Sequence, residues 1–240
     1  MCRKLQIHFI PSMVALMCIV ERIASKQLLQ LMTLLSPMFP IGSFSYSHGF
    51  EQVIYDGLIS CAKDMEGWVR ALLRKGTVRN DAIFLAEAWR SIKNGLDIRD
   101  VAQLACAMSG SREREMENCL QGEAFLQASN AYGLPVDVHD EKLVYPIAVG
   151  LVCARLGIGL IAAASAYLHC FVANLVQVGL RLVPLGQKEG IKILNALEND
   201  ILTLSQRIPG MTRADLGSAA IMLDICAMRH ETLYSRNFRS

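Results

Sequence analysis

The sequence predicts an all-α fold, built as a single-domain bundle of about ten helices. Apolar residues recur at helical spacing along most of the chain. No segment shows the sustained alternation of apolar and polar residues between turn residues that would indicate a strand. With 240 residues, the chain can bury a substantial core without cross-links. We expect a helical domain over residues 28–228, an N-terminal extension over 1–27 and a C-terminal tail over 229–240.

Composition narrows the expected class of protein. Hydrophobic residues make up 52% of the chain and charged residues 19%, which indicates either a membrane span or large buried interfaces. The net charge is only +2 and the basic residues form no run, so nucleic acid is not an expected partner. The eight cysteines are scattered without a Cys-x-x-Cys pair, a usage typical of reduced thiols. We therefore expect a cytoplasmic protein.

The first 27 residues combine a basic start with an apolar run, as a signal peptide does. Pro11 interrupts that run, and Met17 rather than a small residue precedes Cys18, so a cleavage site is poorly supported. Met13 and Met17 offer alternative translation starts. The expectation is a flexible extension, and the true start stays open.

A loop rich in proline, glycine and aromatic residues follows the predicted helix over residues 28–35. Pro37 and Pro40 end that helix because each lacks a backbone donor and restricts the residue before it. So many aromatic residues predict a loop packed against the body of the protein or against a partner. The loop residues singled out as a candidate site are Pro37, Pro40, Gly42, Phe44, Tyr46, Ser47, His48, Gly49 and Glu51.

One alternative reading of this loop is catalytic. Residues 45–49, Ser-Tyr-Ser-His-Gly, differ at one position from the Gly-x-Ser-x-Gly nucleophile elbow. That elbow requires a strand before the serine, whereas a helix is predicted here. A serine hydrolase using Ser45 or Ser47 with His48 remains the alternative function, and a helix-to-helix connection is the simpler interpretation.

The middle of the chain reads as a series of short amphipathic helices. Helices are predicted over residues 50–57, 62–75, 80–94, after Asp97, and from Ser111 to about Tyr132, with Asn80 and Asp97 as N-caps. The acidic residues in the first turn after Ser111 suit the helix dipole and are interpreted as structural. In the following connection, Asp137, His139, Asp140 and Glu141 are potential metal ligands. Without a second cluster at ligand spacing, a solvated loop is predicted there.

The stretch from Leu156 to Val178 carries no formal charge, and about 20 apolar residues suffice to span a bilayer. A small membrane protein is therefore a second alternative. However, Ser165 with His169, and Asn174 with Gln177, form polar pairs at helical spacing. This pattern favours a central helix surrounded by protein. Gly157 to Ala162 also match Gly-x-Gly-x-x-Ala, but without the strand and acidic residue of a dinucleotide site. The glycines are expected to separate two helices.

The last third of the chain predicts two more helices. One covers residues 188–207 with Ile191, Leu194, Leu197, Ile201 and Leu204 along one side. The other is capped by Asp215 and places Ile221, Ile225 and Met228 on its buried side.

The final residues combine aromatic and arginine side chains, the types that dominate the energetics of interfaces. We interpret this tail as a docking segment, with a solvated, frayed end as the alternative. The candidate partner-binding residues are Arg229, His230, Glu231, Tyr234, Ser235, Arg236, Phe238 and Arg239.

Several of these motifs resemble the UreF family of urease accessory proteins. Residues 36–51 match the family's Ser-Pro-x-x-Pro-[Ile/Val]-Gly-[Gly/Ser] signature and its continuation to Glu51, with Ser43 where many members have glycine. Residues 145–150, 174–177 and 181–187 also resemble the family, and residues 228–240 match its closing signature except at Asn237, where leucine is usual.

The resemblance implies a non-enzymatic accessory protein, part of a metallochaperone complex. Such a protein bridges a UreD/UreH-type protein and the GTPase UreG, commonly dimerises, and supports GTP-dependent nickel insertion into apo-urease. By analogy, Tyr234, Arg236 and Phe238 would engage the UreD-type partner, and the loop would shape an adjoining surface. His48 and His230 are weak candidates for nickel contact in transit, since isolated histidines are more often hydrogen-bonded structural groups. No catalytic residue and no cofactor are expected.

Overall fold

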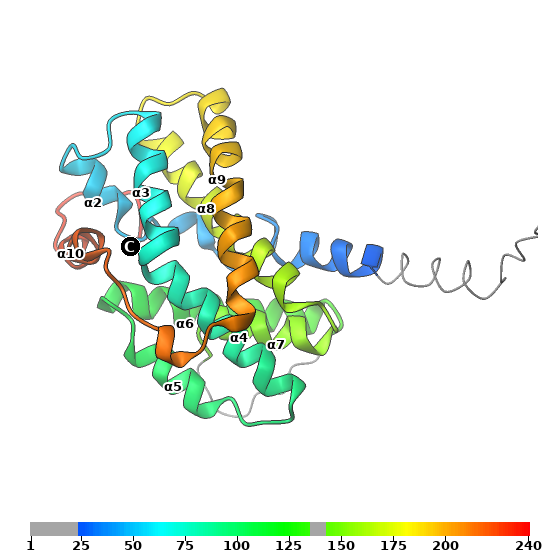
Figure 1. The fold of residues 1–240 in the computed structure, drawn as a ribbon. Helices are drawn as coiled ribbons and strands as arrows, with labels where there is room; N and C mark the ends of the chain where they lie inside the picture. The colour runs from blue at the N-terminus through cyan, green and yellow to red at the C-terminus, as the bar shows by residue number, and fades with distance from the viewer. Residues whose placement is uncertain (1–23, 135–142) are drawn as a thin grey trace, which may run out of the picture.

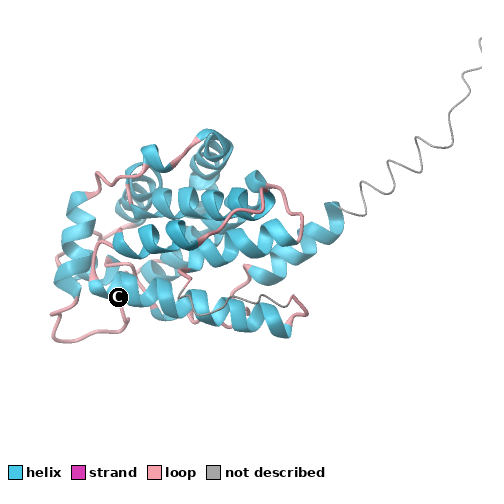
Figure 2. Ribbon diagram, turned by 90° about the horizontal axis from the view of Figure 1, so that it is seen from below, coloured by secondary structure: helices cyan, strands magenta, loops and turns pink. Residues whose placement is uncertain are grey.

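The computed structural model describes residues 24–134 and 143–240, and within them all regular secondary structure is helical (Figures 1 and 2). This confirms the predicted all-α, single-domain bundle of about ten helices. A first helix covers residues 24–34. The other elements are η1 (Ser43–Ser45), α2 (Phe50–Tyr55), α3 (Ala62–Lys75), α4 (Thr77–Lys93), α5 (Arg99–Ala107), α6 (Arg112–Ala131), α7 (Tyr145–Arg155), α8 (Leu160–Leu182), α9 (Gln187–Arg207), η2 (Ile208–Gly210), η3 (Arg213–Asp215) and α10 (Ile221–His230).

The centre of the bundle is formed by α4 and α7, which pack closely against each other. Every residue of α7 except Arg155 is buried. Gly150 makes the close approach possible, because a Cβ at this position would lie only 2.3 Å from the carbonyl oxygen of Leu85 on α4. The short apolar helix after Tyr145 is thus a core element.

Helix α8 passes along this centre and also contacts α9. It is the one helix, among the described residues, long and apolar enough to cross a membrane, and half of its most apolar window is buried inside the fold. The break before α8 is confirmed, since Gly157 has a left-handed φ of 71°. The expectation that protein surrounds α8 on all sides is wrong, because His169 and Gln177 are exposed. These polar side chains mark the solvent face of the helix.

Two predicted caps are displaced. Helix α4 begins at Thr77 rather than after Asn80, and Asn80 instead lies buried in the helix, where its carbonyl oxygen accepts a hydrogen bond from Gly217 N at 3.0 Å. The N-cap of α5 is Ile98, although Asp97 does accept from Arg99 N at 2.9 Å. The predicted start of α6 at Ser111 is confirmed, and the Ser111 side chain accepts a hydrogen bond from Arg114 N as its N-cap.

The predicted buried face of α10 is wrong. Ile221, Ile225 and Met228 are 67%, 41% and 48% exposed, whereas Leu223, Cys226 and His230 face the interior. The reason is that His230 binds two inward-facing carboxylates, so the helix turns its polar end into the protein and an apolar face outward. The predicted cap at Asp215 is also wrong: Asp215 accepts a hydrogen bond from Thr212 N, the N-cap of the short η3 turn, and the N-cap of α10 is Ala220. On α9, Ile191 is likewise exposed, while Ile193 takes the core position.

Some expectations fall outside the described residues. They include the predicted N-terminal extension up to residue 23, and the four potential ligands Asp137, His139, Asp140 and Glu141.

Candidate functional site

The C-terminal segment, residues 231–240, folds back over the signature loop, residues 36–51. Backbone hydrogen bonds join the two: Arg239 N donates to Ser45 O, and Ser47 N donates to Ser240 O, both at 2.8 Å. The Ser47 hydroxyl also donates to Ser240 O. The two stretches with the strongest family resemblance therefore form one structural unit, although they lie at opposite ends of the sequence.

His230, at the end of α10, contacts two carboxylates beneath this unit. Its Nδ1 lies 2.7 Å from Glu113 Oε2 on α6, and its Nε2 lies 3.0 Å from Glu51 Oε2 on α2. The imidazole is fully buried. Each of these two contacts requires one proton between nitrogen and oxygen, so the three side chains together hold two protons.

The same carboxylates also hold the C-terminal segment. Glu51 accepts from the backbone N–H groups of Asn237 at 2.7 Å and Phe238 at 3.0 Å, while Arg236 pairs with Glu113 at 2.6 Å. Burial alone would raise the pKa of Glu51, but the hydrogen bonds from His230 and from residues 237 and 238 outweigh it and lower that pKa. Glu51 is thus held as a carboxylate.

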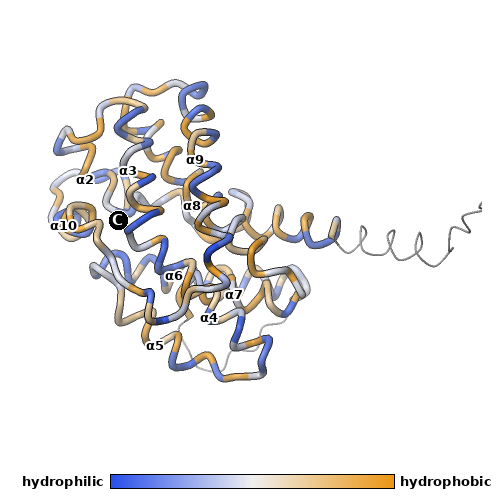
Figure 3. Tube along the Cα trace, in the orientation of Figure 1, coloured by the Kyte–Doolittle hydropathy of each residue, from blue (hydrophilic) through white to orange (hydrophobic). Residues whose placement is uncertain are grey.

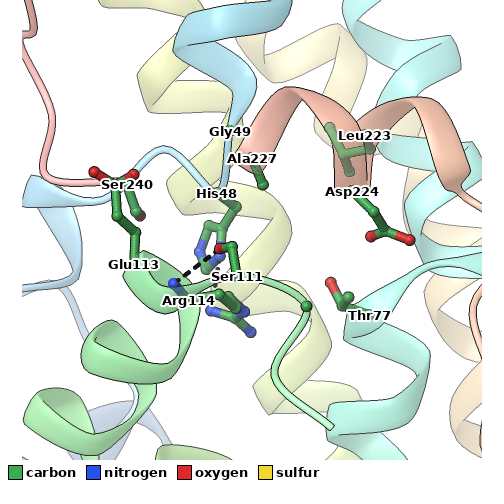
Figure 4. Close-up of a pocket in the computed structure, with 11 residues that line it drawn as sticks. His48, Gly49, Thr77, Ser111, Glu113, Arg114, Leu223, Asp224, Ala227 and Ser240 are labelled. Carbon is green, nitrogen blue, oxygen red and sulfur yellow. Dashed lines mark hydrogen bonds between the residues drawn. The ribbon is translucent and has the colours of Figure 1, made fainter. Parts of the chain in front are cut away.

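A second buried cluster surrounds Arg114, close to the start of α6. Its guanidinium binds Asp81, lies 3.0 Å from Glu117 Oε1, and donates to His48 Nδ1 at 2.8 Å. His48 therefore carries its proton on Nε2, which faces Glu117 at 3.2 Å. Figure 4 shows His48 and Ser111 beside Arg114.

The charges in this cluster are strongly influenced by burial. Burial and the neighbouring Arg114 lower the pKa of His48 well below its usual value, so the ring is neutral. Burial raises the pKa of Asp81 and of Glu117, although Arg114 opposes the shift in both. Arg114 therefore supplies the positive charge that compensates these two buried acids.

The residues of the signature loop divide between core and surface. Tyr46, Ser47, Gly49 and Glu51 are buried, whereas Phe44 is 69% exposed. Pro37 and Pro40 are exposed and Gly42 has a φ of 72°. Gly49, with φ of 80°, is required by close packing, because a Cβ there would lie 2.8 Å from Ala227 Cα on α10. The loop is packed against the body of the protein.

The candidate docking residues are also divided. His230 and Phe238 are buried, and the Arg181 guanidinium lies 4.3 Å from the centroid of the Phe238 ring. Tyr234 is fully exposed. The other candidates are exposed residues, of which Arg229 pairs with Asp56, Glu231 accepts from Arg112 N, Arg236 pairs with Glu113, and Ser235 and Arg239 lie along the segment.

The geometry does not assemble a serine nucleophile with a base. The Ser47 hydroxyl is buried and donates to Ser240 O, while His48 faces Arg114 and Glu117. Within residues 24–134 and 143–240, neither Ser45 nor Ser47 is hydrogen-bonded to His48. The loop therefore does not present the nucleophile and base pair of a serine hydrolase.

Metal binding has no ready-made centre in the described part of the chain, where no group of three or more His, Cys, Asp or Glu side chains is arranged to hold an ion. Both ring nitrogens of His48 and of His230 face side-chain partners. Either histidine would have to leave a partner to contact nickel.

Sequence reasoning missed the buried charges of α6. It assigned the acidic residues of the first turn to the helix dipole and did not anticipate that Glu113, Arg114 and Glu117 are buried. A signal was available: polar residues 114, 117, 118 and 121 recur at helical spacing in line with Phe125, which is fully buried. A polar stripe that continues an apolar one indicates a buried network.

Among the exposed apolar side chains of the described residues, two sets each lie on a single helix. Ile221, Met222, Ile225 and Met228 form the outer face of α10, and a groove of about 220 Å³ lies between this helix start and Trp68 of α3. Leu28, Leu29 and Met32 are exposed on the helix of residues 24–34. Figure 3 shows hydrophobic stretches in both helices, which lie at opposite sides of the molecule (Figure 1).

Comparison with known proteins gives consistent matches. The UreF family model matches residues 59–198. Urease accessory protein UreF 1 of Brucella canis is 44% identical over 216 residues, covering 89% of this chain and 94% of the relative. Urease accessory protein UreF of Mesorhizobium japonicum is 43% identical over 218 residues, covering 90% and 98%. That of Agrobacterium fabrum is 44% identical over 214 residues, covering 89% and 96%. The similarity thus extends over most of each chain.

Proposed function

The chain belongs to the UreF family of urease accessory proteins, and we propose that it acts in urease maturation as a non-enzymatic bridge between a UreD/UreH-type protein and the GTPase UreG. In this role it supports GTP-dependent nickel insertion into apo-urease in the cytoplasm. GTP hydrolysis belongs to UreG, so this chain needs no catalytic residue and no cofactor of its own.

The observation that carries the bridging role is the pair of exposed apolar surfaces at opposite sides of the bundle. A bridge must bind two partners at once, and contiguous exposed apolar surface is typical of protein interfaces. A single apolar face would serve one partner only. The high hydrophobic content of the chain, 52%, is explained if both faces are covered in the assembled complex.

We assign the UreD-type partner to the docking surface formed by the outer face of α10 and the exposed Tyr234. Tyrosine is among the side chains that contribute most to interfaces, and here it is fully exposed between two buried anchors, His230 and Phe238. Arg236 and Phe238 then act indirectly, by fixing the position of the segment that presents Tyr234. The signature loop supports the same segment from below.

The surface on the helix of residues 24–34 is left for UreG or for a second copy of this chain, because homodimerisation also belongs to the proposal. His48 and His230 remain weak candidates for contact with nickel in transit.

Co-purification with UreD-type and UreG-type proteins, combined with size-exclusion light scattering, tests the bridge. The diagnostic variant is Ile225→Glu on α10, and the matched control is Leu202→Glu on α9, whose side chain is similarly exposed. We expect the unchanged chain and the control to capture the UreD-type partner, and Ile225→Glu to lose it while keeping its helix content. Failure of the folded, unchanged chain to capture either partner would refute the bridge.

A further inference from the structure

A small cavity lies beneath the signature loop and is lined by residues of the loop, α6, α7 and α8. Its volume is about 20 Å³. Ile41 and His48 of the loop line it, together with Asn118 of α6, Tyr145 of α7, and Cys170 and Asn174 of α8. One water molecule needs roughly 10–15 Å³ by the same measure. The cavity therefore has room for one water but not for a larger ligand.

Two of the residues that line this cavity each carry a buried polar atom that is unpartnered among the described residues: the carbonyl oxygen of Asn118 and the hydroxyl of Tyr145. The two residues are only 5% and 7% exposed. Buried polar atoms in native proteins almost always have a hydrogen-bond partner, supplied by the protein or by an ordered water. One of these atoms is an acceptor, and the other is a hydroxyl that can donate. A single molecule that pairs both atoms must be able to accept and to donate.

The cavity favours a neutral ligand. Burial and Arg114 keep the lining His48 neutral by lowering its pKa, and burial raises the pKa of Cys170 to about 11, so its thiol stays protonated. Arg114 also lines the cavity, but its charge is already matched by Asp81 and Glu117. An ion in the cavity would therefore find no opposite charge left to pair with among these lining groups.

We propose that this cavity is a binding site for one ordered water molecule, which accepts a hydrogen bond from the Tyr145 hydroxyl and donates one to the Asn118 carbonyl oxygen. The water connects α6 to α7 beneath the signature loop. Together with these helices it supports the loop. This site is independent of the bridging function proposed above.

The sign of a stability change tests the site. If a water pairs the Tyr145 hydroxyl, the nearly isosteric Tyr145→Phe removes a satisfied hydrogen bond and lowers the melting temperature by about 2–4 °C. If the hydroxyl is unpaired, its removal relieves a buried polar group and raises the melting temperature. Tyr132→Phe is the control, because Tyr132 is 43% exposed.

Coupling between the two side chains identifies a shared ligand. We expect the double variant Tyr145→Phe/Asn118→Leu to lose less than the sum of the single losses, since either change alone already disrupts the same water. A crystal structure of the unchanged chain that resolves ordered waters should show one between these atoms. A raised or unchanged melting temperature for Tyr145→Phe, additive effects, or a cavity without an ordered water would each overturn the proposal.

Discussion

His230 Nε2 lies 3.0 Å from Glu51 Oε2, although 179 residues separate the two in the sequence. Through this contact the last helix of the protein is tied to the loop that follows its first described helix. Glu51 also links the C-terminal segment to this contact, because it accepts hydrogen bonds from the backbone N–H groups of Asn237 and Phe238. The position of the C-terminal segment therefore depends on one carboxylate in the N-terminal half.

We first predict that His230→Gln destabilises the protein by about 3 kcal/mol, because the buried carboxylates of Glu51 and Glu113 each lose a short hydrogen bond from the imidazole. Glutamine carries both of its N–H donors on one nitrogen, whereas His230 meets the two carboxylates with separate ring nitrogens. Urea unfolding measures the change. His169→Gln on the exposed face of α8 is the matched control and should change stability by less than about 0.5 kcal/mol. Equal midpoints for the two variants would contradict the role of His230.

Tyr234 and Phe238 should separate docking from folding. Tyr234→Ala should leave stability within about 0.5 kcal/mol, because the side chain is fully exposed, yet abolish capture of the UreD-type partner. Phe238→Ala should cost about 3 kcal/mol or more, because it removes a buried ring that also contacts Arg181. Thermal unfolding and partner capture are measured on both variants. Capture retained by Tyr234→Ala would move the interface elsewhere.

Deletion of residues 234–240 is a stronger form of the same experiment. Helix content should persist, because the central packing of α4, α7 and α8 does not include these residues. Partner capture should be lost. Stability should also fall, since Glu51, Glu117 and Ser47 each lose a hydrogen-bond partner in the deleted segment. Circular dichroism and urea unfolding together would show whether the loss of capture is accompanied by a loss of fold.

The sequence was sufficient for the fold class because helical periodicity and breaker residues act locally. Pro37 and Gly157 disfavour continuation of a helix through their own backbone preferences, and α6 begins after Ser111 as expected. The outward face of α10 was not predictable in this way. Which side of that helix is buried depends on His230 meeting two carboxylates from α2 and α6, and nothing within the helix itself encodes that contact.

The residues of the candidate site were predicted from the sequence, but their spatial arrangement was not. The loop and the tail were each singled out, and the structure joins them through Ser45, Ser47 and Ser240. This pairing is long-range, so local patterns cannot reveal it. Phe238 was expected at an interface because its residue type suits one, but an aromatic ring fits a core equally well.

Acid should release the C-terminal segment through Glu51. Its pKa is lowered in the folded protein, so its contribution to stability is present above the ordinary value near 4.5 and is lost as the pH falls through the lowered pKa. We expect the hydrogen-exchange protection of the Asn237 and Phe238 amides to fall in that range. Glu51→Gln should reduce protection already at neutral pH and flatten the dependence, whereas Glu123→Gln, at an exposed site of α6, should leave it unchanged. An unaltered profile in Glu51→Gln would contradict this assignment.

Replacement of Arg114 should give a stability that rises as the pH falls, opposite to the dependence expected from Glu51. Arg114→Met removes the cation between Asp81 and Glu117, leaving two buried acids whose pKa values burial already raises. We expect a loss of about 3–5 kcal/mol at neutral pH. Because a raised folded-state pKa favours the protonated acid, the variant should regain part of this stability as the pH falls from neutral toward 5. Denaturant unfolding at a series of pH values measures the slope. Arg207→Met, at an exposed site of α9, should show no such recovery. A penalty for Arg114→Met that stays constant with pH would mean that the two acids are compensated by groups other than Arg114.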